Sequence, residues 1–400
     1  MKKRRIWLTL FIMTLTSCEN VERLTHVVPG EFVNDEYVFP MNTLTQLKMY
    51  YKSQYDEVVD GFDEIIIRLS KEVDRYHDYS SINNLKTIND SCGTDEAISI
   101  SDHLFELIKL GVQLTKITKG KFNIAMGSII DLYAPYLEEG NTNVYKDFPV
   151  SDLLIQQALQ AIPTYEEIDN YVFLNEENKT VTLKMYHNEK IILSFGAIAK
   201  GFILQKAYDY LDAFRYPSLL DAGSSTMATI GNNPTNKEGD WRITFRGPSL
   251  ENSNDFLCTV QLKGDYFIST SGDYQQNFIY FDEHGNTKLM HHILDATTGV
   301  SNNYLRSVSL ISKNTSLAVL DALSTAMFNY QTLEEILELI DIVEKEFFCD
   351  ISFVLARPVY NETGQINLNE YNIDVSNSFE QLVTSNYSEN VKEINKIKNY

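Results

Sequence analysis

Apolar side chains recur at helical spacing in several segments of the chain. Residues 53–73, SQYDEVVDGFDEIIIRLSKEV, and residues 101–118 carry apolar residues three or four positions apart. This period predicts amphipathic helices. A further helix is expected directly after Lys200, and the helical pattern returns over residues 315–345.

Short runs rich in β-branched and aromatic residues lie between these segments and predict strands. Residues 179–186 and 190–195 are expected to form a hairpin across His187-Asn188. Strands that cluster in hairpins and are interrupted by helices indicate an α+β fold with mixed, largely antiparallel sheets, rather than a doubly wound parallel sheet. The remaining predicted strands are residues 241–246, 256–268, 277–282, 289–294, 306–312 and 350–356.

The N-terminus has the pattern of an export signal. In MKKRRIWLTLFIMTLTSC a basic head precedes an apolar stretch that is too short to span a membrane comfortably. Leu15-Thr-Ser-Cys18 resembles a bacterial lipobox, in which the cysteine is lipidated and becomes the mature N-terminus. Residues 1–17 are therefore predicted to be a lipoprotein signal peptide, with an ordinary signal peptide or anchor as the alternative. The chain is expected outside the cytoplasm, attached to the cell membrane through Cys18.

Polar segments are predicted at both ends of the mature chain. Residues 18–35 are expected to be a tether between the lipid and the globular part. Residues 376–400 are rich in Asn, Ser, Lys and Glu with little apolar periodicity, and residues 361–400 are predicted to form a polar tail. The globular domain is thus predicted at residues 36–360.

The chain of 400 residues is strongly acidic, with a formal net charge of −21. Residues 1–17 contain four Lys and Arg residues and no acidic residue, so their removal changes the charge to −25. Nonspecific nucleic-acid binding is not expected, because it needs cations that neutralise phosphates. The three remaining cysteines, Cys92, Cys258 and Cys349, are widely spaced, which predicts small buried residues rather than a zinc site or a disulfide framework.

The first stretch with candidate chemistry is SFGAIAKGFILQKAYDYL, residues 194–211. A predicted strand passes through Gly196 and Gly201 into a helix, with Lys200 at the turn. Glycine permits close backbone approach, and a helix N-terminus with a lysine beside it favours an anion such as phosphate. Taken alone, this pattern favours a plain connection whose lysine points into water.

The second stretch is SLAVLDALSTAMF, residues 316–328. Asp321, Ser324 and Thr325 are the polar residues of its central part and share one helix face at positions i, i+3 and i+4. A buried carboxylate is costly unless it is paired or bound to a metal. Asp321 and Thr325 together offer oxygen ligands suited to Mg²⁺. A solvent-facing stripe is the alternative, but the narrowness of the polar face favours function.

The third stretch, residues 268–299, contains ISTSGDYQQNF and HHILDATTG. Its Ser/Thr run into Gly272 could bind phosphate or ribose hydroxyls. Neighbours in a strand face opposite sides, so only one of His291 and His292 is expected to face a site. A histidine near a carboxylate such as Asp295 can act as a general base near neutral pH. A surface histidine beside a turn is the alternative.

The order and spacing of these stretches resemble the ApbE family, the FAD:protein FMN transferases. The resemblance runs from about residue 36 to residue 357. Its most specific part is the combination of HHILD and a following TG with DALST. The matching segments are Asp74–Asn89, Thr118–Tyr133, Ser194–Gly201, Asp221–Ser225, Ser269–Tyr274, His291–Gly299 and Leu320–Ala326.

The resemblance implies an ApbE-like, T-fold-like architecture of two subdomains. It also implies Mg²⁺-dependent transfer of FMN from FAD to a Thr or Ser hydroxyl of an acceptor protein, with release of AMP. His292 would be the base, supported by Asp295, and Mg²⁺ would be held by Asp321, Thr325 and the backbone carbonyl of Ala197. The residues implied to bind FAD are Tyr76, Lys200, Gly201, Thr270, Ser271, Gly272 and, in a more structural role, His291.

The chain departs from the family pattern at Ser194, where an acidic residue is expected, at Ser224 and Ser225 in the glycine-rich segment, and at Ala296 in place of proline. The implied metal-binding side chains are retained, so catalysis is still expected. Two alternatives stay open. The chain could bind FAD, or hydrolyse it to FMN and AMP, without modifying a protein, or it could be a non-enzymatic solute-binding lipoprotein.

Overall fold

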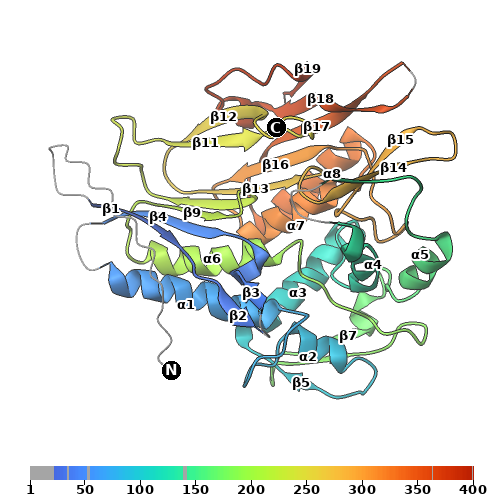
Figure 1. Ribbon diagram of the computed structural model, residues 1–400. Helices are drawn as coiled ribbons and strands as arrows, with labels where there is room; N and C mark the ends of the chain where they lie inside the picture. Colours follow the sequence, from blue (N-terminus) through green and yellow to red (C-terminus); the bar gives the residue numbers. More distant parts are fainter. Residues whose placement is uncertain (1–21, 34–35, 52–54, 138–141, 363, 399) are drawn as a thin grey trace.

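Figure 1 shows the computed structural model of the chain, which describes residues 22–33, 36–51, 55–137, 142–362, 364–398 and 400. The predicted signal peptide, residues 1–17, and the predicted lipidation site, Cys18, lie outside the described residues. Within the described ranges, no helix is long and apolar enough to cross a membrane.

A nine-stranded sheet forms the centre of the fold, in the order β1-β4-β9-β10-β13-β16-β17-β18-β19. Every neighbouring pair is antiparallel except β18 and β19, which run parallel. The strands are β1 (Glu22–Val27), β4 (Thr45–Tyr51), β9 (Ser218–Ala222), β10 (Thr226–Ile230), β13 (Tyr266–Gly272), β16 (Ser307–Ser312), β17 (Ser352–Tyr360), β18 (Ile366–Ser376) and β19 (Val391–Ile397).

Smaller sheets and helices surround this sheet. The helices are α1 (Asp56–Val73), α2 (Leu85–Asp90), α3 (Asp102–Ile117), α4 (Gly127–Tyr133), α5 (Asp152–Leu159), α6 (Ala199–Asp212), α7 (Leu317–Met327), α8 (Leu333–Phe347) and α9 (Asn377–Glu380). The smaller sheets are β11 (Trp241–Arg246) with β12 (Phe256–Leu262), β2 (Glu31–Val33) with β3 (Glu36–Val38), β5 (Ile98–Ser99) with β8 (Thr180–Leu183) and β7 (Val172–Asn175), and β15 (Thr287–His291) with β14 (Asn277–Phe281) and β6 (Thr142–Tyr145).

Three apolar cores hold these layers together. The largest lies between one face of the central sheet and the helices α1, α6 and α7. The opposite face packs against the β11–β12 hairpin through residues such as Trp241 and Phe245, and Phe379 of α9 joins this core. A third core joins α4 and α5 to the β15-β14-β6 sheet. The mixed α+β class with largely antiparallel sheets is thereby confirmed.

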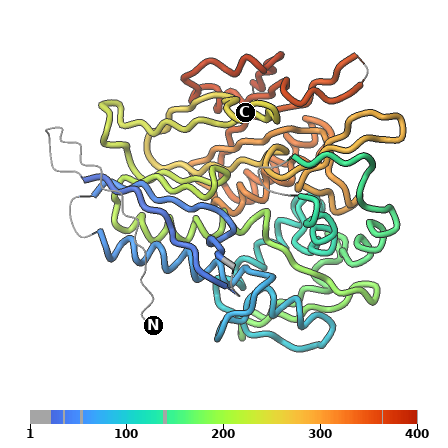
Figure 2. Tube along the Cα trace, viewed as in Figure 1, coloured from blue at the N-terminus to red at the C-terminus, as the bar shows by residue number. Residues whose placement is uncertain are grey.

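Both ends of the described chain belong to the central sheet, which corrects the predicted tether (18–35) and polar tail (361–400). β1 pairs with β4 along its whole length, and Figure 2 shows this blue pair beside the yellow-green β9. At the other end, Ile373, Val375 and Phe379 are fully buried. Polar composition misled here because β1 and β19 are edge strands, whose outward side chains face solvent.

The predicted helices at 53–73 and 101–118 and the helix after Lys200 are confirmed as α1, α3 and α6. The predicted segment 315–345 is two helices, α7 and α8, and the strand-like run 256–268 divides between β12 and β13 near Gly264. The turn at His187-Asn188 is present, but residues 190–195 form a single bridge from Ile192 to Met126 instead of a second strand. β8 pairs with β5 and β7 instead.

Candidate active site

A cavity of about 450 Å³ lies where α1, α6, α7 and the end of β13 converge. Its volume and mixed lining are typical of small-molecule sites. Eight of the twelve site residues predicted from the sequence line it: Tyr76, Ala197, Lys200, Thr270, Ser271, His292, Asp321 and Thr325. The other four, Gly201, Gly272, His291 and Asp295, do not.

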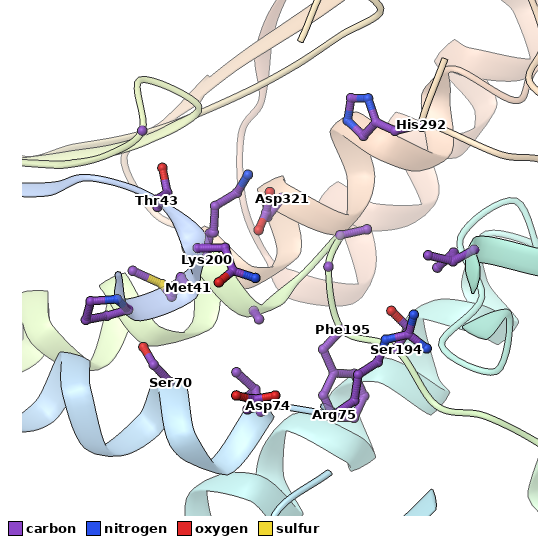
Figure 3. A pocket seen from close by; sticks show the side chains of 18 of the residues that line it. Met41, Thr43, Ser70, Asp74, Arg75, Ser194, Phe195, Lys200, His292 and Asp321 are labelled. Carbon is purple, nitrogen blue, oxygen red and sulfur yellow. The ribbon is translucent and has the colours of Figure 1, made fainter. Parts of the chain in front are cut away.

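Asp321 lies in the middle of α7, and only 4% of its surface is exposed. The helix is buried on nearly all sides, so its polar notch is part of the site and not a solvent-facing stripe. The backbone N–H of Gly201 donates a hydrogen bond of 2.9 Å to Oδ2 of Asp321. Burial raises the pKa of Asp321, and the positive charge of Lys200 opposes this shift. Figure 3 shows the Lys200 side chain extending beside this carboxylate.

Gly201 is required by the packing of two helices. A Cβ atom at this position would lie 2.3 Å from the carbonyl oxygen of Leu317, at the start of α7. The absence of a side chain therefore lets the first turn of α6 approach α7 closely enough for its N–H to reach Asp321. Gly196 is different, because a Cβ added there would meet no atom within 4 Å.

Hydroxyl groups join the end of β13 to α7. Oγ of Ser271 lies 2.7 Å from Oγ of Ser324 and 3.4 Å from Oγ1 of Thr325. Ser324 in turn donates a hydrogen bond of 2.9 Å to the backbone carbonyl of Asp321. This network fixes the strand and the helix, and leaves Ser271 and Thr325 lining the cavity.

The two adjacent histidines occupy opposite environments, as the strand period predicts. His291 is fully buried away from the cavity, which corrects its placement among the cofactor-binding residues. Its Nε2 lies 2.9 Å from the carbonyl oxygen of Asn302, and its Nδ1 accepts from the N–H of Ile293 at 3.3 Å. Both contacts fit the neutral ring, and burial lowers the pKa of His291 to about 3.

His292 lines the cavity (Figure 3). Its Nδ1 lies 3.3 Å from the carbonyl oxygen of Gln276, so the neutral ring donates through Nδ1 and keeps Nε2 free to accept a proton. Burial, with a smaller contribution from the charge of Lys200, lowers the pKa of His292 to about 4.

Asp295 holds the following turn instead of facing the cavity, so it is a positioning residue and not a catalytic one. Its carboxylate accepts from the N–H of Thr297 at 2.8 Å, from Nδ2 of Asn302 at 3.0 Å and from Nζ of Lys121 at 2.9 Å. Burial opposes ionisation of this carboxyl group, but the donors from Thr297 and Lys121 outweigh it and lower the pKa of Asp295. Lys121 itself lines the cavity, and the sequence reasoning missed it.

On the opposite wall of the cavity, the sequence reasoning identified Tyr76 but missed its neighbour Arg75. Arg75 lies over the ring of Tyr76, donates to its hydroxyl at 2.6 Å and forms an ion pair with Asp131. The Arg75 side chain is largely buried by this arrangement, while 56% of Tyr76 is exposed. The one available signal was that Arg75 directly precedes Tyr76 in the DRYHDYSS segment.

The donors around Asp321 suit magnesium better than zinc. The described residues contain no group of three or more His, Cys, Asp and Glu side chains that could hold a metal ion. Asp321, Thr325 and Ala197 line one cavity, and the ligands expected from them, two side chains and one backbone carbonyl, offer only oxygen. Mg²⁺ is usually bound by one or two carboxylates together with water and substrate phosphates. Among the residues that the structure covers, no cation forms an ion pair with Asp321, so its charge is available.

Two of the departures from the family motif lie close to this site. Ser194 lines the cavity, so the position of the expected acidic residue is indeed next to the ligand space. Ser224 follows Gly223 in a left-handed turn, and its N–H donates a hydrogen bond of 2.7 Å to Oδ1 of Asp221. The turn therefore closes around Asp221 without a second glycine.

Comparison with known sequences decides the family. The sequence profile of the ApbE family matches residues 41–347, which is most of the chain. The chain belongs to the ApbE family. It is 26% identical over 250 residues to the FAD:protein FMN transferase of Klebsiella pneumoniae, covering 61% of this chain and 69% of that one. It is also 26% identical over 265 residues to the enzyme of that name from Vibrio cholerae, covering 66% and 71%.

Solved structures of ApbE proteins share the fold. The ApbE protein of Thermotoga maritima superposes with a TM-score of 0.62 at 23% identity, covering 92% of this chain and all of that one. The flavin transferase ApbE of Vibrio cholerae gives a TM-score of 0.63 at 19% identity, covering 90% and 99%. The resemblance drawn from the motifs and the prediction that the chain is a transferase enzyme are thus confirmed.

Proposed function

We propose that this ApbE protein transfers FMN from FAD to a Thr or Ser hydroxyl of an acceptor protein, with Mg²⁺ as cofactor and AMP as the leaving product. The observation that carries the proposal is the placement of Asp321, Lys200 and His292 in one cavity. Flavin transfer itself is supported by the relatives named FAD:protein FMN transferase.

The charges of the cavity match the needs of a pyrophosphate. Lys200 supplies a positive charge in the first turn of α6, where backbone N–H groups also favour an anion. Asp321, Thr325 and the carbonyl of Ala197 would hold Mg²⁺. When bound, the metal would neutralise charge that develops on the phosphates. Lys121, held by Asp295, is a further cation of the lining, together with Lys71 and Arg75.

In this proposal His292, which lines the cavity, accepts the proton of the attacking hydroxyl. In the proposed step the hydroxyl oxygen bonds to the phosphorus of the FMN half. The bond between that phosphorus and the bridging oxygen breaks, and the bridging oxygen leaves as part of AMP. The hydroxyl proton moves to Nε2 of His292, because Nδ1 donates to Gln276. A pKa of about 4 keeps this ring neutral, and so able to accept, across neutral pH.

We further propose that the protein acts outside the cytoplasm on the membrane surface, through lipid attached to Cys18. Support for this part comes from the signal-like N-terminus and the lipobox pattern. Mass spectrometry of the protein purified from membranes tests it. A diacylated or triacylated Cys18 as the first residue agrees with the proposal, and an intact Met1 contradicts it.

Transfer and hydrolysis of FAD differ only in whether a protein hydroxyl or water attacks. The deciding experiment incubates the mature chain with FAD, Mg²⁺ and a panel of candidate acceptors, followed by flavin fluorescence in a denaturing gel and by AMP quantification. A fluorescent acceptor band with an equal amount of AMP supports transfer. AMP and free FMN without a band support the hydrolase alternative, and the absence of AMP contradicts both.

A further inference from the structure

A second cavity, of about 400 Å³, lies on the opposite face of the central sheet from α1 and α6. Its lining includes Arg23 of β1, Lys48 of β4 and Arg242 of β11, together with a single carboxylate, that of Asp240. These four side chains sum to a formal charge of +2. The whole chain has a formal net charge of −21, so this cavity is a local positive region in an acidic protein.

Within the described part of the chain, no ion pair neutralises these three cations. Across the residues that the structure describes, none of Arg23, Lys48 and Arg242 forms an ion pair or a side-chain hydrogen bond. Lys48 lies opposite Thr25 in β1 and Leu219 in β9, so the sheet register fixes it beside Arg23. Burial and the charge of Arg23 lower the pKa of Lys48, and Asp221 offsets this only in part. Like charges held this close favour an anion between them.

The short sequence distance between Arg23 and Cys18 indicates which anion this cavity binds. Arg23 follows Cys18 by five residues, which span at most about 18 Å when fully extended. If Cys18 carries lipid, Arg23 is therefore confined to the neighbourhood of the bilayer surface. β1 then leads away from Arg23, and residues beyond its end, Pro29 and Glu31, line the catalytic cavity.

We infer that Arg23, Lys48 and Arg242 bind the phosphate of an anionic phospholipid headgroup and hold this face of the sheet against the membrane. The inference rests on the proposed lipid anchor at Cys18. A headgroup phosphate would be contacted by two guanidinium groups and one ammonium group, which suit phosphate oxygens. The catalytic cavity, at the far end of β1 and on the other face of the sheet, would remain accessible to an acceptor protein.

The test uses the mature chain with Cys18→Ser, so that no acyl chain contributes to membrane binding. Sedimentation with phosphatidylcholine vesicles, with or without about 30% phosphatidylglycerol, measures the headgroup preference at low ionic strength. We expect binding only to the anionic vesicles. The triple variant Arg23→Gln, Lys48→Gln, Arg242→Gln is expected to bind them at least tenfold more weakly.

A second triple variant controls for total charge. Arg68→Gln, Lys190→Gln, Lys345→Gln removes three exposed cations outside the second cavity and is expected to retain vesicle binding. Equal binding to both vesicle types, or an equal loss in the two triple variants, would overturn the inference. Calorimetric binding of inorganic phosphate that needs Lys48, without vesicle binding, would assign the cavity to a free phosphate and overturn the lipid assignment.

FMN transfer to a soluble acceptor separates this inference from the proposed function. Both triple variants should transfer FMN at the unaltered rate, because none of the six residues lines the catalytic cavity. If neither the unsubstituted chain nor the two triple variants transferred FMN, the proposed function would be contradicted. The vesicle-binding result would still support the membrane inference. We expect the triple variant of Arg23, Lys48 and Arg242 to lose vesicle binding but to transfer FMN normally. The control triple variant should keep both activities.

Discussion

The backbone amide of Gly201 donates a hydrogen bond of 2.9 Å to Oδ2 of Asp321, which lies 120 residues further along the chain. This bond joins the first turn of α6 to the middle of α7. It places the buried carboxylate next to Lys200, the neighbour of Gly201 in sequence. The stretch 194–211, which taken alone favoured a plain connection, and the stretch 316–328 therefore form one site because two helices pack in close contact.

Gly196 and Gly201, the two glycines of the turn before and into α6, give a matched pair of variants. Gly201→Ala would place a methyl group 2.3 Å from the carbonyl oxygen of Leu317, so the helices must separate. We expect a loss of about 1–3 kcal/mol in the free energy of unfolding, measured in urea. Gly196→Ala meets no atom within 4 Å and should leave the unfolding free energy unchanged. Equal effects of the two substitutions would contradict the packing role of Gly201.

Lys200 and Lys206 lie on the same helix. Substituting each in turn distinguishes a loss of phosphate binding from a general effect on the helix. Lys206 forms an exposed ion pair with Glu106, at 2.7 Å, outside the cavity. Lys200→Gln should weaken FAD binding by about tenfold or more, since a charged hydrogen bond to phosphate is lost. Lys206→Gln should leave it unchanged. Quenching of flavin fluorescence on titration measures both, and similar affinities for the two variants would exclude the phosphate contact.

Substitutions at the two adjacent histidines should have different effects: the one at His292 on the chemical step, and the one at His291 on stability. His292→Asn is expected to lower the turnover number by about 10²–10⁴-fold, the usual loss for a general base, while FAD binding changes little. His291→Asn should lower turnover far less, because His291 does not line the cavity. Single-turnover rates at saturating FAD make this comparison. A larger loss in His291→Asn would reverse the assignment of the base.

His291 also predicts a pH dependence of stability. Its folded-state pKa of about 3 lies below the ordinary value of 6.5, so the unfolded chain binds more protons between these values. Stability is therefore lost as the pH falls through 6.5, by about 2 kcal/mol at pH 5 from this residue. Urea unfolding at pH 7.5 and pH 5 should show a smaller difference in His291→Asn than in the unsubstituted chain. Identical differences would show that His291 is not held neutral.

Sequence patterns captured the local structure and the residue types of the site more fully than its geometry. The spacing in SLAVLDALSTAMF placed Asp321 and Thr325 on one helix face, and the strand period separated His291 from His292. The burial of α7, which turns that polar face into a site, depends on contacts with α6 and β13 that no local pattern contains.

Other parts of the site depend on contacts between distant segments. Lys121 reaches Asp295 across 174 residues; it lies in the matching segment Thr118–Tyr133, but no local pattern marked it as a cavity residue. Edge strands were equally hidden, because β1 and β19 pair on one side only and carry too few apolar residues to stand out. The ends of the chain were thus misassigned, and Lys121 was missed, because in both cases the deciding contacts join segments that are far apart in the sequence.

The central claim is that Asp321 holds the magnesium ion needed to cleave FAD. The most direct test measures AMP release from FAD by the unsubstituted chain and by Asp321→Asn, each with Mg²⁺ and with EDTA. The exposed Asp350→Asn serves as the control. We expect AMP release by the unsubstituted chain and the control only when Mg²⁺ is present. We expect at least a ~100-fold lower rate in Asp321→Asn with its melting temperature retained. Undiminished AMP release by Asp321→Asn would contradict the account.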